Sequence, residues 1–232
     1  MFSKGAFSAA ILMASASPLA AQGFSGGELS IEALAFADGN DWGYTTYSAS
    51  LEYTLTRDIS IAGDLSFYDF NSLDLGVGNF TVHGIYHLSN VMSAGVFIGQ
   101  DGRDDEGDDL TFIGVEGGYE TGRLLFEGYA AQYGGGDDAT VAAIDAEYIF
   151  NDEVTLLGEV GLVDFEDELV TRLSLGGQYA FLRGPEVYGE IGSVTSDDED
   201  EIFIGAGARI EFGAARGTTF DRRSLFDVLP GF

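Results

Sequence analysis

The sequence predicts an all-β protein, a closed antiparallel transmembrane β-barrel of about twelve strands. Three observations predict this fold: apolar and polar residues alternate along short segments, turn residues separate the segments, and an aromatic residue recurs at a nearly constant interval. The composition agrees, because 45% hydrophobic and 13% aromatic residues accompany a net charge of −29. A disordered acidic chain would lack the aromatic residues, whereas alternation gives each strand one apolar and one polar face.

The alternating segments also set the limits of the expected strands. We expect strands over residues 28–37, 43–55, 59–69, 78–88, 91–100, 110–120, 123–134, 139–150, 153–164, 169–181, 185–195 and 201–212. Short connections alternate with longer acidic ones along the chain. Bacterial barrels have short periplasmic turns and longer extracellular loops, so this order predicts the same arrangement here.

The first residues are typical of a secretory signal peptide. Lys4 precedes an apolar run that ends at Ala16, and a proline and small residues follow. We therefore expect cleavage after Ala21, which gives a signal peptide over 1–21 and a barrel domain over 22–212. The alternative is a buried N-terminal helix, but the rest of the chain offers no predicted helix against which it would pack.

The chain contains no cysteine, which excludes disulfides, thiol chemistry and cysteine-ligated metal sites. After the N-terminal run, no stretch approaches the 18 uninterrupted apolar residues that indicate a membrane-spanning helix. The negative charge opposes nucleic-acid binding, and no nucleotide or cofactor motif is present.

An aromatic residue stands just before a short connection about every 32 residues, the length of two strands with their connections. The repeat consists of Tyr53, Tyr86, Tyr119, Tyr148, Tyr179 and Phe212. We expect these side chains to form an aromatic girdle at one membrane interface, where the rings face lipid and their polar edges face headgroups. A propeller blade, the alternative β-repeat, needs about 40 residues and four strands, and fits the interval poorly.

Alternation assigns one face of each strand to lipid. Leu173, Leu175 and Tyr179 share one side of their strand, and Arg172 lies on the other. A central arginine costs roughly 2–4 kcal/mol in hydrocarbon, so the charged row is expected to face the lumen. A water-soluble barrel would turn the apolar row inward. Alternation alone does not separate the two barrels, but the export signal and the aromatic repeat favour the membrane.

The last expected strand resembles a known assembly signal. Its end, from Gly207 to Phe212, resembles the C-terminal β-signal of bacterial outer-membrane proteins, and residues 27–212 resemble the small porin-like barrels of Gram-negative bacteria, of the alphaproteobacterial type. The resemblance implies an outer-membrane location, contact with lipid and lipopolysaccharide, and insertion by the barrel-assembly machinery. The chain departs from the pattern by continuing past Phe212. We expect 213–232 to be a short periplasmic tail, either docked at the barrel mouth or mobile.

Charged side chains on the inward rows are the candidate pore lining. These residues are Glu52, Asp64, His83, Glu116, Glu127, Asp145, Glu147, Glu159, Arg172, Glu190, Arg209 and Glu211. Asp64, Glu127, Glu159 and Glu190 follow short connections by similar distances, so we expect them to form a partial ring. Clustered carboxylates concentrate cations. The hypothesis is a narrow, cation-preferring channel for ions or small hydrophilic solutes.

Two other functions stay open at this point. In the first, Arg172, Arg209 and His83 neutralise the carboxylates, and the barrel is a non-conducting structural or adhesive protein. The second is a lipid hydrolase in which a serine such as Ser66 pairs with His83 or His87. The sequence lacks a Gly-x-Ser-x-Gly elbow and shows no third orienting group, so we expect no enzymatic activity.

Two acidic runs, 101–109 and 197–201, fall in expected loops. Neither has the spacing of a calcium-binding EF-hand loop, so we expect no defined metal site. We expect solvated loops that hold divalent cations loosely, where these cations bridge lipopolysaccharide phosphates.

Overall fold

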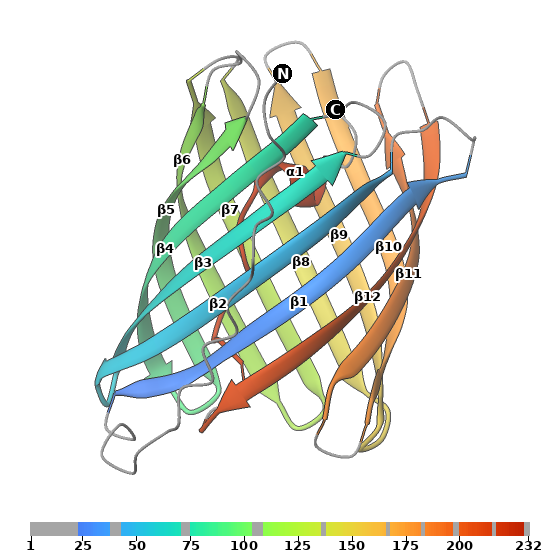
Figure 1. The fold of residues 1–232 in the computed structure, drawn as a ribbon. Helices are drawn as coiled ribbons and strands as arrows, with labels where there is room; N and C mark the ends of the chain where they lie inside the picture. The colour runs from blue at the N-terminus through green and yellow to red at the C-terminus, as the bar shows by residue number, and fades with distance from the viewer. Residues whose placement is uncertain are drawn as a thin grey trace, which may run out of the picture.

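The computed structural model describes residues 23–37, 43–70, 75–103, 109–135, 138–165, 168–181, 184–196, 200–214 and 217–229. Twelve antiparallel strands form one closed barrel, in which each strand pairs with its neighbours in sequence (Figure 1). Strands β1 and β12 close the ring, with a register that runs from Gly26 opposite Gly213 to Phe36 opposite Phe203. The predicted fold class is therefore confirmed. The expected signal peptide, 1–21, lies outside the described residues.

All twelve expected strands are present, with ends that differ from the prediction by a few residues. Their bounds are β1 Phe24–Phe36, β2 Tyr44–Thr56, β3 Ile59–Phe70, β4 Leu75–Ser89, β5 Met92–Arg103, β6 Leu110–Thr121, β7 Leu124–Gly134, β8 Ala139–Ile149, β9 Val154–Phe165, β10 Glu168–Ala180, β11 Glu186–Thr195 and β12 Asp200–Gly213. A single short helix, α1, spans Leu225–Val228 in the described part of the chain. None of the described helical residues forms a segment long and apolar enough to cross a membrane.

The two ends of the barrel carry different sets of connections. The turn end carries the connections that follow β2, β4, β6, β8 and β10, and the loop end carries the others. The ends differ less in connection length than the sequence indicates, because residues 166–167 alone join β9 to β10 while 181–185 join β10 to β11. The cause is strand pairing that extends into several expected loops. Asp101, for example, belongs to β5.

Apolar side chains cover the outside of the barrel, as the alternation predicts. Leu175 is 72% exposed and Ile113 is 62% exposed, both on outward positions. Arg172, three residues before Leu175, points inward and is 4% exposed. A protein in water would bury such an outer surface, whereas a bilayer makes it favourable.

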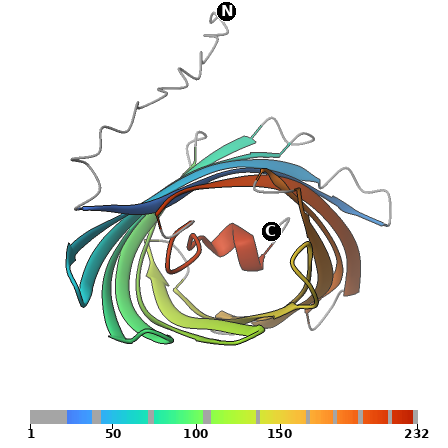
Figure 2. The same cartoon turned by 90° about the horizontal axis from the view of Figure 1, so that it is seen from below.

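Residues 217–229 lie inside the barrel, which corrects the expected periplasmic tail. The chain leaves β12 at the turn end, and residues 217–229, here the C-terminal segment, rise through the lumen to α1 near the loop end (Figure 1). Figure 2 shows the same segment surrounded by the ring of strands. Phe220 is 1% exposed and Arg223 is also 1% exposed, so the segment is packed against the wall.

Apolar side chains fill the loop end of the lumen around α1. This apolar layer comprises Leu34, Phe36, Tyr44, Tyr68, Phe70, Val77, Phe97, Phe112, Tyr129, Ala131, Tyr133, Ala139, Val141, Ala143, Val163, Val170, Val194 and Phe203 from the wall, with Leu225, Phe226, Val228 and Leu229 from the C-terminal segment. Strands at this end are thus apolar on both faces. The inward apolar row needs a partner inside the barrel, and α1 supplies it.

Candidate functional site

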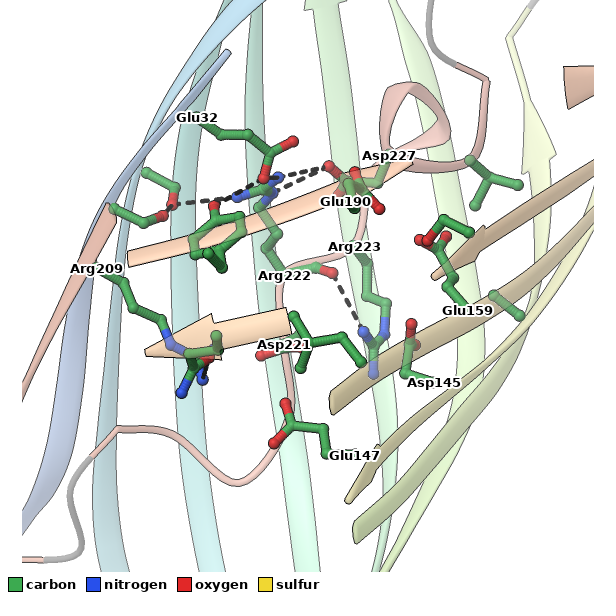
Figure 3. Close-up of a pocket in the computed structure, with 18 of the residues that line it drawn as sticks. Glu32, Asp145, Glu147, Glu159, Glu190, Arg209, Asp221, Arg222, Arg223 and Asp227 are labelled. Atoms are coloured by element: carbon green, nitrogen blue, oxygen red, sulfur yellow. Dashed lines mark hydrogen bonds and ion pairs between the residues drawn. The ribbon is translucent and has the colours of Figure 1, made fainter. Parts of the chain in front are cut away.

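The polar part of the lumen holds two adjoining cavities. One, about 210 Å³, lies beside the C-terminal segment and reaches Glu159 (Figure 3). The other, about 540 Å³, lies toward the turn end and reaches Arg57 and His87. Glu147 and Asp221 line both cavities, so the two are adjacent polar spaces between the turn end and mid-barrel.

Arg172 on β10 organises the wall at the inner end of this space. Its Nε donates to Glu159 on β9 at 3.0 Å, and its Nη2 donates to Glu190 on β11 at 2.9 Å. The guanidinium also stacks over Phe203, with 4.4 Å to the ring centroid. One arginine therefore joins carboxylates from the two neighbouring strands and neutralises part of their charge.

A second arginine, Arg209 on β12, organises the turn-side half. Its Nε donates to Glu186 at 2.7 Å and its Nη2 donates to Gln178 at 2.6 Å. Glu28 and Glu211 lie farther away, with oxygens 3.9 and 4.0 Å from the guanidinium nitrogens. These contacts link the first strand to the last across the closure of the barrel.

His83 on β4 lies between two carboxylates. Nε2 is 2.5 Å from Asp64 on β3, and Nδ1 is 2.8 Å from Glu116 on β6. Both ring nitrogens are thereby occupied, and the side chain is fully buried. Ser66, the serine considered as a partner of this histidine, hydrogen-bonds Asn79 instead.

The second histidine, His87, contacts hydroxyl groups. Its Nε2 is 3.0 Å from the Ser60 hydroxyl and its Nδ1 is 2.9 Å from the Ser93 hydroxyl. Glu52 lies 3.8 Å from Nε2, but its other carboxylate oxygen accepts from the backbone N–H of Thr219 at 2.7 Å. The His87 imidazole thus contacts two serine hydroxyls, whereas the Glu52 carboxylate binds the C-terminal segment.

The C-terminal segment brings two arginines into this acidic wall. Arg223 donates to Glu116, with 3.0 Å between Nη2 and Oε2, and also pairs with Glu127. Its guanidinium lies over the Tyr129 ring at 4.4 Å. Burial lowers the pKa of Arg223, but the carboxylates of Glu127 and Glu116 outweigh burial and raise that pKa above its ordinary value. The guanidinium therefore stays charged.

The other arginine, Arg222, pairs mainly within the segment. Its Nη2 is 2.9 Å from Asp227, and Glu32 on β1 lies at 4.0 Å (Figure 3). Asp227 also accepts from the Tyr68 hydroxyl at 2.9 Å. The pair thus ties the segment to β1 and β3.

The expected carboxylate ring is present only in part. Glu127, Asp145 and Glu159 lie directly opposite one another on β7, β8 and β9. Asp64 lies away from this row, paired with His83. Glu190 joins Glu159 only through Arg172.

Two of the expected lumen residues keep unpaired carboxylates. The side chains of Asp145 and Glu147 have no hydrogen-bonding or ion-pair partner among the described residues. Both line the cavity beside the C-terminal segment, as does Asp221 of that segment (Figure 3). This part of the lumen therefore holds carboxyl groups that no guanidinium group pairs with.

Sequence reasoning missed the residues that hold the C-terminal segment at the loop end. Asp101 accepts from the Ser224 hydroxyl at 2.9 Å and from the Leu225 backbone N–H at 3.0 Å. Asn79 donates to Asp101 and to the Arg223 carbonyl. A usable signal was the apolar inward row at the loop end, which is incompatible with a water-filled lumen.

The expected aromatic girdle lies on the outside at the turn end. Tyr53 and Tyr86 are 50% and 54% exposed, and Tyr119, Tyr148 and Tyr179 are also exposed. Phe212 is partly covered by Phe24, which stacks on it with ring centroids 6.0 Å apart. These positions suit a membrane interface, and that role stays a prediction.

The described residues contain no group of three or more acidic or histidine side chains arranged to hold a metal ion. Of the two acidic runs, residues 104–108 and 197–199 lie outside the described part of the chain. Asp101 is not a loop ligand, because it is fully buried in β5 and bonded to the C-terminal segment.

A closed antiparallel barrel of an even number of strands, with an apolar outside and a polar lumen, is the architecture of outer-membrane β-barrels. Among solved structures, the chain is similar to the KdgM porin, with a TM-score of 0.62 and 11% identity over 80% of this chain and 99% of that chain. It is similar to the NanC porin, with a TM-score of 0.60 and 10% identity over 78% and 98%. The CymD monoaromatic hydrocarbon channel gives a TM-score of 0.53 and 10% identity over 84% and 89%.

These likenesses are in the fold and leave the alphaproteobacterial type a prediction. No protein-family model matches the sequence, and no curated protein matches it.

Proposed function

We propose that this chain is a porin-like outer-membrane channel for the passive passage of ions and small hydrophilic solutes, with a preference for cations. One observation carries the proposal: a closed barrel with an apolar outside encloses a polar space with excess negative charge. Eight carboxyl groups and four guanidinium groups line the cavity beside the C-terminal segment. Seven carboxyl groups and two guanidinium groups line the cavity at the turn end.

The membrane location follows from the outer surface. Leu65, Ile98, Ile144 and Ile191 are each about 60% exposed on outward positions of different strands. Outer-membrane lipid covers this surface in our proposal, with lipopolysaccharide and loosely held divalent cations at the loop end and the tyrosine girdle at the turn end. The barrel-assembly machinery inserts the chain through the strand that ends at Phe212, and the turn end faces the periplasm.

The cation preference rests on Asp145 and Glu147. Their carboxylates have no basic partner among the described residues, while Arg172 and Arg209 are already occupied by carboxylates. A cation that enters from the turn end meets carboxyl groups that are free to accept it, whereas an anion meets guanidinium groups whose charge is balanced.

Planar-bilayer recording of the purified, folded protein tests the channel. We expect a small single-channel current and, in a salt gradient, a reversal potential on the cation side. Because the C-terminal segment occupies the lumen, the recording includes a variant in which that segment is displaced. The proposal is wrong if both proteins are folded and neither conducts, and the cation preference is wrong if the reversal potential indicates anions.

One observation favours a second candidate, a non-conducting structural barrel. The apolar layer around α1 leaves its inward side chains less than 10% exposed, which closes the loop end in this conformation. The two candidates differ in one measurement: a structural barrel conducts no ions even when the C-terminal segment is displaced.

A further inference from the structure

We propose that the C-terminal segment is a gate. It is a plug built into the chain that closes the loop end of the lumen, and the channel opens when the plug moves out of this position. This inference rests on the proposed channel function and adds its regulation. The segment contacts the wall by two distinct means, which lie at different heights along the barrel.

The lower contact is electrostatic. The Thr219 and Asp221 backbone N–H groups donate to Glu52 and Glu127 at 2.7 and 3.1 Å. Higher up, Arg223 joins Glu116 and Glu127. The wall at this height is acidic, and the segment offers it N–H groups and a guanidinium. Charge complementarity therefore identifies the segment as the occupant of this part of the lumen.

The upper contact is apolar and depends on α1. Phe226 packs on Tyr68 and Phe70, with both ring centroids 5.7 Å from its own. Val228 lies against β9 at Gly161, where an added Cβ would be 2.6 Å from Val228 Cγ1. A glycine on the wall thus makes room for the plug. Asp227 and Asp101 border this layer and are themselves hydrogen-bonded. The layer consists of side chains that are less than 10% exposed, so it obstructs the passage of ions while α1 is in place.

Two glycines flank the point where the chain turns back from the barrel toward the plug. Gly213 and Gly217 have φ angles of 101° and 82°, a region that residues with a Cβ rarely adopt. The Gly217 carbonyl packs directly against Gly26 of β1, which has no side chain to obstruct it. The two glycines send the chain from the end of β12 back into the lumen, and β12 completes its pairing with β1 before the reversal.

A disulfide lock tests the position of the plug and its role as a gate. A Cβ on Gly161 would lie 3.6 Å from the Val228 Cβ, within the range of disulfides, and the chain has no other cysteine. We expect the double variant Gly161→Cys, Val228→Cys to form a disulfide in the folded protein, measured as loss of thiol labelling. The oxidised lock should abolish opening events in bilayer recordings, and reduction should restore them.

A second pair of full-length variants opens the plug without a cross-link. Phe226→Asp places a carboxylate in the apolar layer, so α1 should leave it and single-channel conductance should rise severalfold. Phe226→Leu keeps an apolar side chain and serves as the matched control with unchanged conductance. For the electrostatic contact, Arg223→Gln should raise the open fraction, and Arg123→Gln at an exposed turn should not.

The outcomes separate the gate from the channel. The gate is wrong if the two cysteines stay reduced in folded protein, or if oxidised, reduced and Phe226→Asp proteins conduct equally. The channel itself is wrong, and the gate with it, if the disulfide forms and yet neither the reduced protein nor folded Phe226→Asp conducts. If Phe226→Asp fails to fold, the conductance of the oxidised double-cysteine variant compared with that of its reduced form still tests the gate.

Discussion

Glu116 on β6 holds Arg223 of the C-terminal segment, with 3.0 Å between Oε2 and Nη2. Its other oxygen is 2.8 Å from Nδ1 of His83, which in turn contacts Asp64. The result is a buried chain of hydrogen bonds and ion pairs that joins β3, β4 and β6 to the segment. Removing one member leaves its neighbours without a partner in a space that water does not reach.

We therefore expect Glu116→Gln to destabilise the barrel by about 3 kcal/mol, the usual cost of breaking a buried ion pair. The measurement is denaturant unfolding of protein reconstituted in vesicles. Glu120→Gln, at an exposed position of the same strand, is the control and should change stability by about 0.5 kcal/mol or less. Equal stability of the two variants would show that Glu116 has no structural role.

Deleting residues 217–232 should leave barrel assembly intact but lower its stability. Assembly survives because all the pairs between β1 and β12 lie at or before Gly213. Stability falls because Glu116 and Glu127 lose Arg223, and the apolar layer loses α1. Gel-mobility shifts on heating would report folding, and denaturant unfolding would report stability. Failure to insert would mean that the assembly signal lies in the deleted residues and not at Phe212.

The strands and their faces were predictable because they follow from a period of two. Each residue of β10 shows its face by its neighbours alone, so Leu175 outside and Arg172 inside needed no long-range information. The position of the C-terminal segment was not predictable in this way. Arg223 and Glu116 are 107 residues apart, and no local pattern indicates which of the many lumen carboxylates an arginine of the tail will meet.

The candidate site was predicted as a set of residues but not as a set of pairs. Asp145 and Asp64 were both expected to line the lumen, and nothing in the sequence indicates which of the two has an ion-pair partner. The structure places Asp64 beside His83 and leaves Asp145 with no ion-pair partner among the described residues. Strand register brings Glu127 and Glu159 level with Asp145, and register depends on turn geometry that alternation does not specify.

The ion preference should depend on those unpaired carboxylates. Asp145→Asn and Glu147→Gln should each shift the reversal potential in a salt gradient toward the anion side, and the double variant should shift it further. The side chains keep their size, so conductance should change less than selectivity. Asp58→Asn, in an exposed turn, is the matched control. An unchanged reversal potential in the double variant would place the selectivity elsewhere in the lumen.

The outer surface gives the most direct test of the membrane location. Leu175 is 72% exposed at the middle of β10, where a bilayer would surround it with acyl chains. Leu175→Arg should lower the free energy of unfolding in vesicles by about 2–4 kcal/mol, because the guanidinium must leave water. Asp58→Arg adds the same side chain at an exposed turn and should be nearly neutral. If both variants are equally stable, or if the wild type is monodisperse without detergent, the apolar face does not contact lipid.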